Sequence, residues 1–106
     1  MNFENKRIEV FRLVSTGKMK SVVEYHSING MDFGFYESKR EKEFYAIHLD
    51  SGFAAVTMES KGYGQKKGFE VLKEKAKAIQ EKHIEGALPK IKKQLAEFGL
   101  TYPLNG

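Results

Sequence analysis

Apolar and polar side chains alternate along the first half of the chain, which is the pattern of strands in an antiparallel sheet. Five such segments follow one another, at residues 6–14, 20–28, 31–38, 43–49 and 53–58. The connections between them are short, so neighbouring segments are expected to pair in an up-and-down order. Asn29-Gly30 is the strongest turn signal, because both residues tolerate the positive φ of a two-residue hairpin loop.

Apolar residues recur every three or four positions in the second half of the chain, which is helical spacing. The step from Ile79 to Ile84 breaks this phase, and Gly86 and Pro89 follow closely. Glycine suits the residue after a helix, and proline suits the first turn of one. We therefore predict a C-terminal helix over residues 69–99, kinked or split near Gly86–Pro89, and an irregular tail over 100–106.

The order of these elements predicts one α+β domain over residues 1–106, a five-stranded antiparallel β-meander (6–58) followed by the helical segment. A chain of 106 residues has the size of a single domain. Its 41% hydrophobic and 30% charged residues are values of globular proteins, which excludes a chain that is disordered throughout.

The predicted sheet is apolar on both faces, unlike a half-exposed antiparallel sheet. A two-residue loop at Asn29-Gly30 places Val22, Glu24, His26, Ile28, Met31, Phe33 and Phe35 on one face, and Val23, Tyr25 and Tyr36 on the other. One helix can cover only one of these faces. We expect the second helical segment to wrap over the other face, with a dimer or a target surface as the alternative.

The chain has no run of about 18 apolar residues and no apolar segment of a signal peptide near Met1. Cysteine is absent, which excludes disulfides, thiol chemistry and thiolate metal sites. We therefore expect a cytoplasmic protein that does not bind membranes.

The positive charge of the chain lies in its second half. Residues 1–59 carry eight Lys/Arg against nine Asp/Glu, and residues 60–106 carry ten Lys against five Glu. This excess can attract phosphate or an acidic protein surface, although a lysine-rich helix can also be merely solvated. Candidate contacts to nucleic acid or another anion are Lys61, Tyr63, Lys66, Lys67, Lys73 and Lys77.

The glycine-rich loop at 61–68 joins the last strand to the helix and has the physical properties of a phosphate contact. Its glycines match neither G-x-x-x-x-G-K-[ST] nor G-x-G-x-x-G, so a nucleotide-hydrolase site is not indicated.

The three histidines, His26, His48 and His83, lie at no metal-ligand spacing. His26 shares a face with Glu24, and such a pair can act in acid–base chemistry, but a packed, hydrogen-bonded imidazole is the simpler interpretation. We predict no catalytic residues, no metal site and no cofactor.

Aromatic residues on the strands are mostly explained by core packing. The candidates for a protein interface are Phe33, Phe35, Tyr36 and Tyr45. Exposed rings beside lysines are also typical of single-strand nucleic-acid binding. The strand order of an RNA-recognition motif is absent, however.

The segment 44–78 runs from a strand through Asp50-Ser51-Gly52 to a second strand, and then through Gly62-Tyr63-Gly64-Gln65-Lys66-Lys67 into a lysine/glutamate-rich helix. In this respect it resembles small uncharacterised proteins of bacteriophages and mobile elements of Gram-positive bacteria. The resemblance covers about a third of the chain and carries over no functional residue. It implies host-takeover, anti-defence (including anti-CRISPR-type) or DNA-transaction roles.

These observations lead us to expect a non-enzymatic binding protein, an inhibitor or adaptor that acts through a protein–protein surface or associates with itself. Nucleic-acid binding through the loop and helix lysines is the alternative, and an enzyme would need a pocket that gathers Glu24, His26 or His48.

Overall fold

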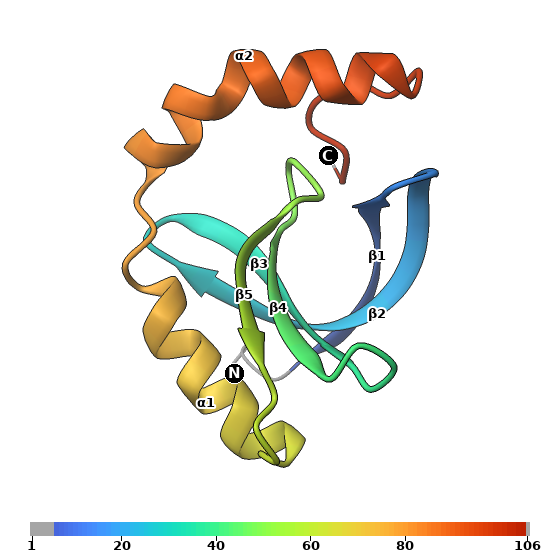
Figure 1. Cartoon of the computed structure of the whole chain (residues 1–106). Helices are drawn as coiled ribbons and strands as arrows, with labels where there is room; N and C mark the ends of the chain where they lie inside the picture. Colours follow the sequence, from blue (N-terminus) through green and yellow to red (C-terminus); the bar gives the residue numbers. More distant parts are fainter. Residues whose placement is uncertain (1–5, 106) are drawn as a thin grey trace.

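The computed structural model describes residues 6–105 as a five-stranded sheet followed by two helices (Figure 1). The elements are β1 (Arg7–Val14), β2 (Gly17–Ile28), β3 (Met31–Ser38), β4 (Glu43–His48), β5 (Ala54–Glu59), α1 (Gln65–Ala76) and α2 (Glu81–Glu97). Each strand pairs antiparallel with the next, in the order β1-β2-β3-β4-β5. The predicted α+β fold with an antiparallel meander is therefore confirmed.

The β2–β3 hairpin forms as its sequence predicts. Asn29 and Gly30 have φ angles of 55° and 78°, so both adopt the left-handed conformation of a two-residue loop. His26 lies opposite Phe33 and Glu24 opposite Phe35, which is the predicted register. This register fixes which side chains share a face, since one residue of slip would exchange the faces.

The outer face of the sheet is covered by α1. Phe33, Phe35 and Phe44 are no more than 1% exposed and form one core cluster with Phe69 and Leu72 of the helix. The helix approaches the sheet closely because Gly68 has no side chain: a Cβ at this position would lie 2.2 Å from Cζ of Phe44. Gly68 therefore sets the distance between α1 and β4.

The inner face of the sheet is covered by the sheet itself. Val10 of β1 and Val23 of β2 form a second core cluster with Ile47 and Leu49. Within the described residues, this cluster contains no residue of α1 or α2. Two strands separate β1 from β4, so this contact requires a strongly curled sheet. The backbone N–H of Leu13 donates to the carbonyl of Gly52 at 2.8 Å, which brings the end of β1 to the β4–β5 loop.

The C-terminal tail fills the remaining gap between β1 and the β4–β5 loop (Figure 1). The Asn105 Oδ1 accepts from the backbone N–H of Phe11 at 2.8 Å, and its Nδ2 donates to the carbonyls of Phe11 at 2.7 Å and Leu49 at 2.8 Å. The side-chain amide thus bonds both backbone groups of an edge residue, as a neighbouring strand does. The predicted irregular tail has a structural function, and its last residue, Gly106, lies outside the described part.

The helical segment is split, but earlier than predicted: α1 ends at Ala76, α2 begins at Glu81, and Gly86 and Pro89 lie inside α2. Asn29 explains the position of the break. Its Nδ2 donates to the carbonyl of Lys77 at 3.0 Å and to that of Ile79 at 2.7 Å, which satisfies groups that a continuous helix would bond to its next turn.

A capping box then starts the second helix. The side chain of Gln80 accepts from the backbone of His83, and the backbone N–H of Gln80 donates to Nδ1 of His83 at 3.0 Å. From there α2 runs across one end of the curled sheet, and it leaves the inner face to the strands and the tail (Figure 1). The expectation that a second helical segment covers this face is wrong, because the curl of the sheet brings β1 and β2 against Ile47 and Leu49 instead.

Replacing Gly68 by alanine tests the close approach of α1 to β4. Alanine in place of glycine normally stabilises a helix by about 1 kcal/mol. Because the new methyl group would overlap the Phe44 ring, we expect Gly68→Ala to lower the free energy of unfolding in urea by about 1–3 kcal/mol.

Gly86 of α2 provides the matched control. No atom lies within 4 Å of the position of its Cβ, so Gly86→Ala is expected to raise the free energy of unfolding by about 0.5–1 kcal/mol. If Gly68→Ala and Gly86→Ala change the free energy of unfolding in the same direction, the close packing of α1 on Phe44 is contradicted.

Candidate functional site

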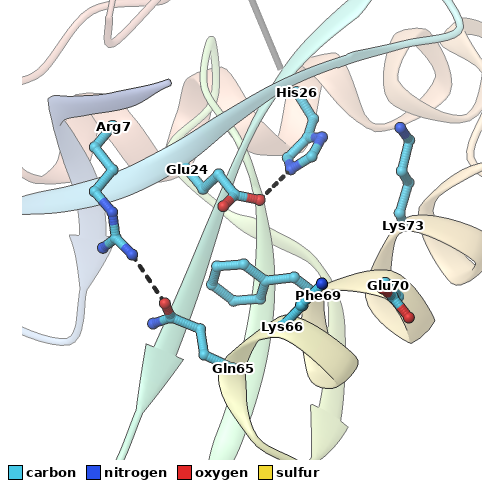
Figure 2. Close-up of a pocket in the computed structure, with 8 residues that line it drawn as sticks. All are labelled: Arg7, Glu24, His26, Gln65, Lys66, Phe69, Glu70 and Lys73. Carbon is cyan, nitrogen blue, oxygen red and sulfur yellow. Dashed lines mark hydrogen bonds and ion pairs between the residues drawn. The ribbon is translucent and has the colours of Figure 1, made fainter. Parts of the chain in front are cut away.

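A polar pocket lies between α1 and the β1–β2 side of the sheet (Figure 2). Its volume is about 460 Å³. The residues that line this polar pocket are Arg7, Glu24, His26, Gln65, Lys66, Phe69, Glu70 and Lys73. The sheet contributes an arginine and a carboxylate–imidazole pair, and the helix contributes two lysines, so the pocket collects charged groups from both layers of the fold.

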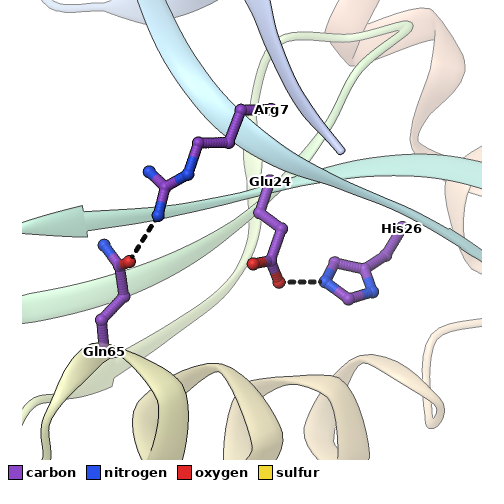
Figure 3. A network of polar contacts seen from close by, with 4 residues as sticks. All are labelled: Arg7, Glu24, His26 and Gln65. Carbon is purple, nitrogen blue, oxygen red and sulfur yellow. Dashed lines mark hydrogen bonds and ion pairs between the residues drawn. The ribbon is translucent and has the colours of Figure 1, made fainter. Parts of the chain in front are cut away.

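A buried pair forms the inner wall of the polar pocket. Nε2 of His26 lies 2.6 Å from Oε2 of Glu24 (Figure 3). The imidazole stacks on Phe35, with ring centroids 4.1 Å apart. His26 is only 4% exposed. The carboxylate can only accept, so Nε2 is the donor of this hydrogen bond. Nδ1 is buried without a hydrogen-bond partner in the described part of the chain.

This arrangement limits what His26 can do chemically. Nδ1 has almost no contact with solvent, and Figure 2 shows it on the side of the ring toward Lys73. The pair therefore holds the Glu24 carboxylate in place at the pocket wall more readily than it transfers protons to a substrate.

Arg7 and Gln65 bridge the mouth of the polar pocket. Nη2 of Arg7 donates to Oε1 of Gln65 at 2.9 Å, which ties β1 to the first turn of α1 (Figure 3). Lys66 and Lys73 are two helical turns apart and therefore lie on the same side of α1. The structure thus places two of the predicted anion contacts, Lys66 and Lys73, beside an arginine that the sequence did not single out.

The other predicted anion contacts do not join this group. Lys61, Tyr63 and Lys67 are exposed, and none of them lines the polar pocket. Lys77 forms an ion pair with Glu74, with Nζ 2.9 Å from Oε1. Of the predicted anion contacts, Lys66 and Lys73 alone line the polar pocket.

A second candidate site lies on the inner face, where stacked side chains reach the surface. Cζ of Arg12 lies 4.7 Å from the ring centroid of Tyr36, and this ring stacks on Tyr45 at 6.2 Å and 15°. Nη2 of Arg12 also lies 3.6 Å from Sδ of Met19, which is 48% exposed. We call Arg12, Met19, Tyr36 and Tyr45 the tyrosine trough.

Hydrogen bonds hold the tyrosine trough in one arrangement. Nε of Arg12 donates to Oγ of Ser21 at 2.8 Å, and the Tyr45 hydroxyl donates to the Glu41 carboxylate. Partial burial, reinforced by that carboxylate, raises the pKa of the Tyr45 hydroxyl well above its ordinary value, so it remains a donor. Next to these groups lies a cavity of about 300 Å³ lined in part by apolar Leu13, Val14, Ile47 and Ala54.

Two of the four predicted interface residues belong to this trough, and two do not. Tyr36 and Tyr45 are half-buried on the inner face. Phe33 and Phe35, at 0% and 1% exposure, lie in the core beneath α1 and are not open to a partner. The sequence placed them on the same face as His26, and the helix covers that face.

Sequence reasoning did not identify Arg12 or Met19 as site residues. The only available signal was their place on the predicted strands, because the contact with Tyr36 depends on the curl of the sheet. Strand alternation indicates the face of a residue, but not which distant strand that face meets.

The other two histidines have structural positions. Nδ1 of His48 lies 2.9 Å from Oγ of Ser51 and 3.3 Å from the backbone nitrogen of Ser51. These contacts stabilise the β4–β5 loop. Burial lowers the pKa of His48, and this outweighs the opposite effect of the Asp50 and Asp32 carboxylates. His83 closes the capping box of α2.

The described residues include no group of three or more His, Cys, Asp or Glu side chains that could share a metal ion. Neither α1 nor α2, the helices in this part of the chain, is long and apolar enough to span a membrane.

The buried His48 makes the stability of the protein depend on pH. Because its pKa is lower in the folded state, the unfolded chain binds more protons below the ordinary value of 6.5. The stabilisation is thus complete above about pH 6.5 and is lost as the pH falls through the folded-state pKa, with a slope of at most about 1.4 kcal/mol per pH unit.

Urea denaturation at several values between about pH 5.5 and 7.5 measures this effect, since few carboxylates titrate there. We expect the free energy of unfolding to fall toward the acidic end, and His48→Gln to remove part of that slope. A slope that is the same in wild type and His48→Gln would contradict this role of His48.

The chain matches no family model, no curated protein and no solved structure in the comparisons made.

Proposed function

We propose that this chain is a non-enzymatic binding protein that docks a partner protein on the tyrosine trough. The observation that carries the proposal is the half-exposed stack of Arg12, Tyr36 and Tyr45. Tyrosine and arginine are the residues most enriched among interface hot spots, and methionine is also enriched at interfaces.

The restricted conformations of these side chains in the free protein support the same proposal. Binding normally immobilises flexible side chains at a cost of about 0.5–1.5 kcal/mol each. In the tyrosine trough the bonds of Arg12 to Ser21 and of Tyr45 to Glu41 already restrict the rotamers. A partner therefore meets a preorganised surface.

The adjacent cavity gives such a partner a place to anchor. Its lining combines apolar Leu13, Val14, Ile47 and Ala54 with polar Arg12, Ser15 and Glu41. Such a lining suits a partner side chain with an apolar stem and a polar end, and rim contacts with the tyrosines would exclude water around it. The role as an inhibitor or adaptor, of the anti-defence type that the resemblance to phage and mobile-element proteins implies, belongs to this proposal, as does a cytoplasmic location.

The non-enzymatic part of the proposal is supported by the three histidines. His26 is bonded to Glu24, His48 to Ser51, and His83 to the backbone of Gln80. Histidine is the side chain most often used in acid–base catalysis near neutral pH, and here each imidazole has a structural bond.

Capture from an extract of the native host, treated with nuclease and at moderate salt, tests the proposal. The immobilised proteins are the wild type, an Arg12→Ala/Tyr36→Ala variant, and Tyr63→Ala as a control that removes an exposed tyrosine outside the trough. We expect a protein that wild type and Tyr63→Ala retain and the double variant loses. Titration with that purified protein should show at least about a thirtyfold loss of affinity for the double variant.

Circular dichroism and thermal unfolding must show that the double variant remains folded. Retention of every captured protein by the folded double variant would contradict the proposal, and so would capture that nuclease treatment abolishes. Sedimentation equilibrium of the wild type alone shows whether the partner is a second copy of the chain.

A further inference from the structure

The polar pocket is lined by five charged side chains, which the packing of α1 on the sheet does not require. Arg7, Lys66 and Lys73 contribute three cations, and Glu24 and Glu70 contribute two carboxylates. Figure 2 shows the Glu70 side chain directed away from the Arg7–Gln65 bridge. Because Lys73 has an interaction of its own, the Arg7 guanidinium and the Lys66 ammonium are the cations of this pocket that a ligand can use.

The buried Glu24–His26 pair is a second, independent observation. Apolar residues at both positions would pack against Phe35 without burying a polar group, and such replacements of buried pairs are often neutral or stabilising. The fold instead keeps a carboxylate at the pocket wall, bonded through one oxygen to an imidazole that is 4% exposed and has an orphan nitrogen. An unsatisfied buried group of this kind is rare in native proteins, and a functional site is one of the explanations for it.

The directions of these groups indicate the chemistry of a ligand. The Arg7 guanidinium and the Lys66 ammonium suit an anion with several acceptor oxygens, and arginine binds phosphate through two parallel bonds. Figure 3 shows the second oxygen of Glu24 on the side that faces Arg7 and Gln65. That oxygen can only accept, so the same ligand must also carry a donor such as a hydroxyl group.

We propose that the polar pocket binds a small phosphorylated sugar or polyol. The phosphate lies between Arg7 and Lys66, near the first turn of α1, and a hydroxyl of the ligand donates to Glu24. The volume of about 460 Å³ is in the range of small-molecule sites. This site lies on the outer side of the sheet and is independent of partner binding at the tyrosine trough.

A nucleic-acid backbone offers the same phosphate chemistry but fits less well. Single-strand binding needs a positive groove that follows several successive phosphates. Here Arg7 and Lys66 line one pocket, while Lys61 and Lys67 lie outside it and Lys77 is paired with Glu74. A ligand with one terminal phosphate therefore suits the described surface better than a strand.

Amide NMR of the folded chain tests the site, with ribose 5-phosphate, inorganic phosphate and ribose as separate probes. We expect saturable shifts at Gln65, Lys66 and Phe69 with ribose 5-phosphate, weaker binding of inorganic phosphate and none of ribose. Arg7→Gln should weaken both phosphates about tenfold, because a charge-assisted bond is lost. Arg40→Gln, which removes an exposed arginine of the β3–β4 turn, should change neither.

Glu24→Gln separates the sugar contact from the phosphate contact and keeps an acceptor for His26. We expect it to weaken ribose 5-phosphate severalfold and to leave inorganic phosphate unchanged or tighter, since a negative charge is removed. The proposal is overturned by the absence of saturable shifts up to about 10 mM ribose 5-phosphate, or by equal effects of Arg7→Gln and Arg40→Gln. It is also overturned if a single-stranded oligonucleotide without a terminal phosphate binds at these amides more tightly than ribose 5-phosphate.

Discussion

The central strands β3 and β4 carry apolar side chains on both faces, so each face must be shielded from water if the sheet is to be stable. Helix α1 shields the outer face, where the absence of a side chain at Gly68 lets it approach Phe44. The inner face has no helix to cover it in the described part of the chain. The curl of the sheet shields this face instead, because it brings Val10 and Val23 against Ile47.

The curl of the sheet covers the inner face, but it also places the edge of β1 opposite the β4–β5 loop, where the backbone groups of β1 have no neighbouring strand. Backbone groups along a strand edge need partners when they are shielded from water. The Gly52 carbonyl satisfies Leu13, and the Asn105 amide satisfies both backbone groups of Phe11. The tail residue thus completes the hydrogen bonding of a sheet that does not close into a barrel.

Strand β1 also links the two candidate sites. Arg7 and Arg12 are five residues apart, so strand alternation directs them to opposite faces. Arg7 reaches the polar pocket beneath α1, and Arg12 stacks on Tyr36 in the tyrosine trough. A single strand therefore supplies a guanidinium to each site, and both depend on where the curl of the sheet places β1.

The features predictable from the sequence are those set by neighbours along the chain. Alternation and the turn residues Asn29-Gly30 predict the meander, its register and its two apolar faces, and all three are found. The Glu24–His26 pairing follows from the same register. The local pattern was sufficient to predict these properties, because each of them depends on pairs of strands that are adjacent in the sequence.

The features that sequence reasoning missed involve segments far apart in the chain. The helix ends at Ala76 because the distant Asn29 caps it, whereas Gly86 and Pro89 are the stronger local signals. The role of Asn105 needs β1, some 94 residues away, and the burial of Phe35 needs α1. The polar pocket likewise needs Arg7 and Gln65, which are 58 residues apart.

Native-state hydrogen exchange of the β1 amides tests most directly whether the chain itself closes the inner face. The account predicts that the outward-facing amides of Phe11 and Leu13 are protected almost as well as that of Val10, which faces β2 by alternation. Asn105→Ala should then remove the protection of Phe11 and leave that of Val10. Exchange of Phe11 and Leu13 in the wild type at the rate of free edge amides would contradict the account.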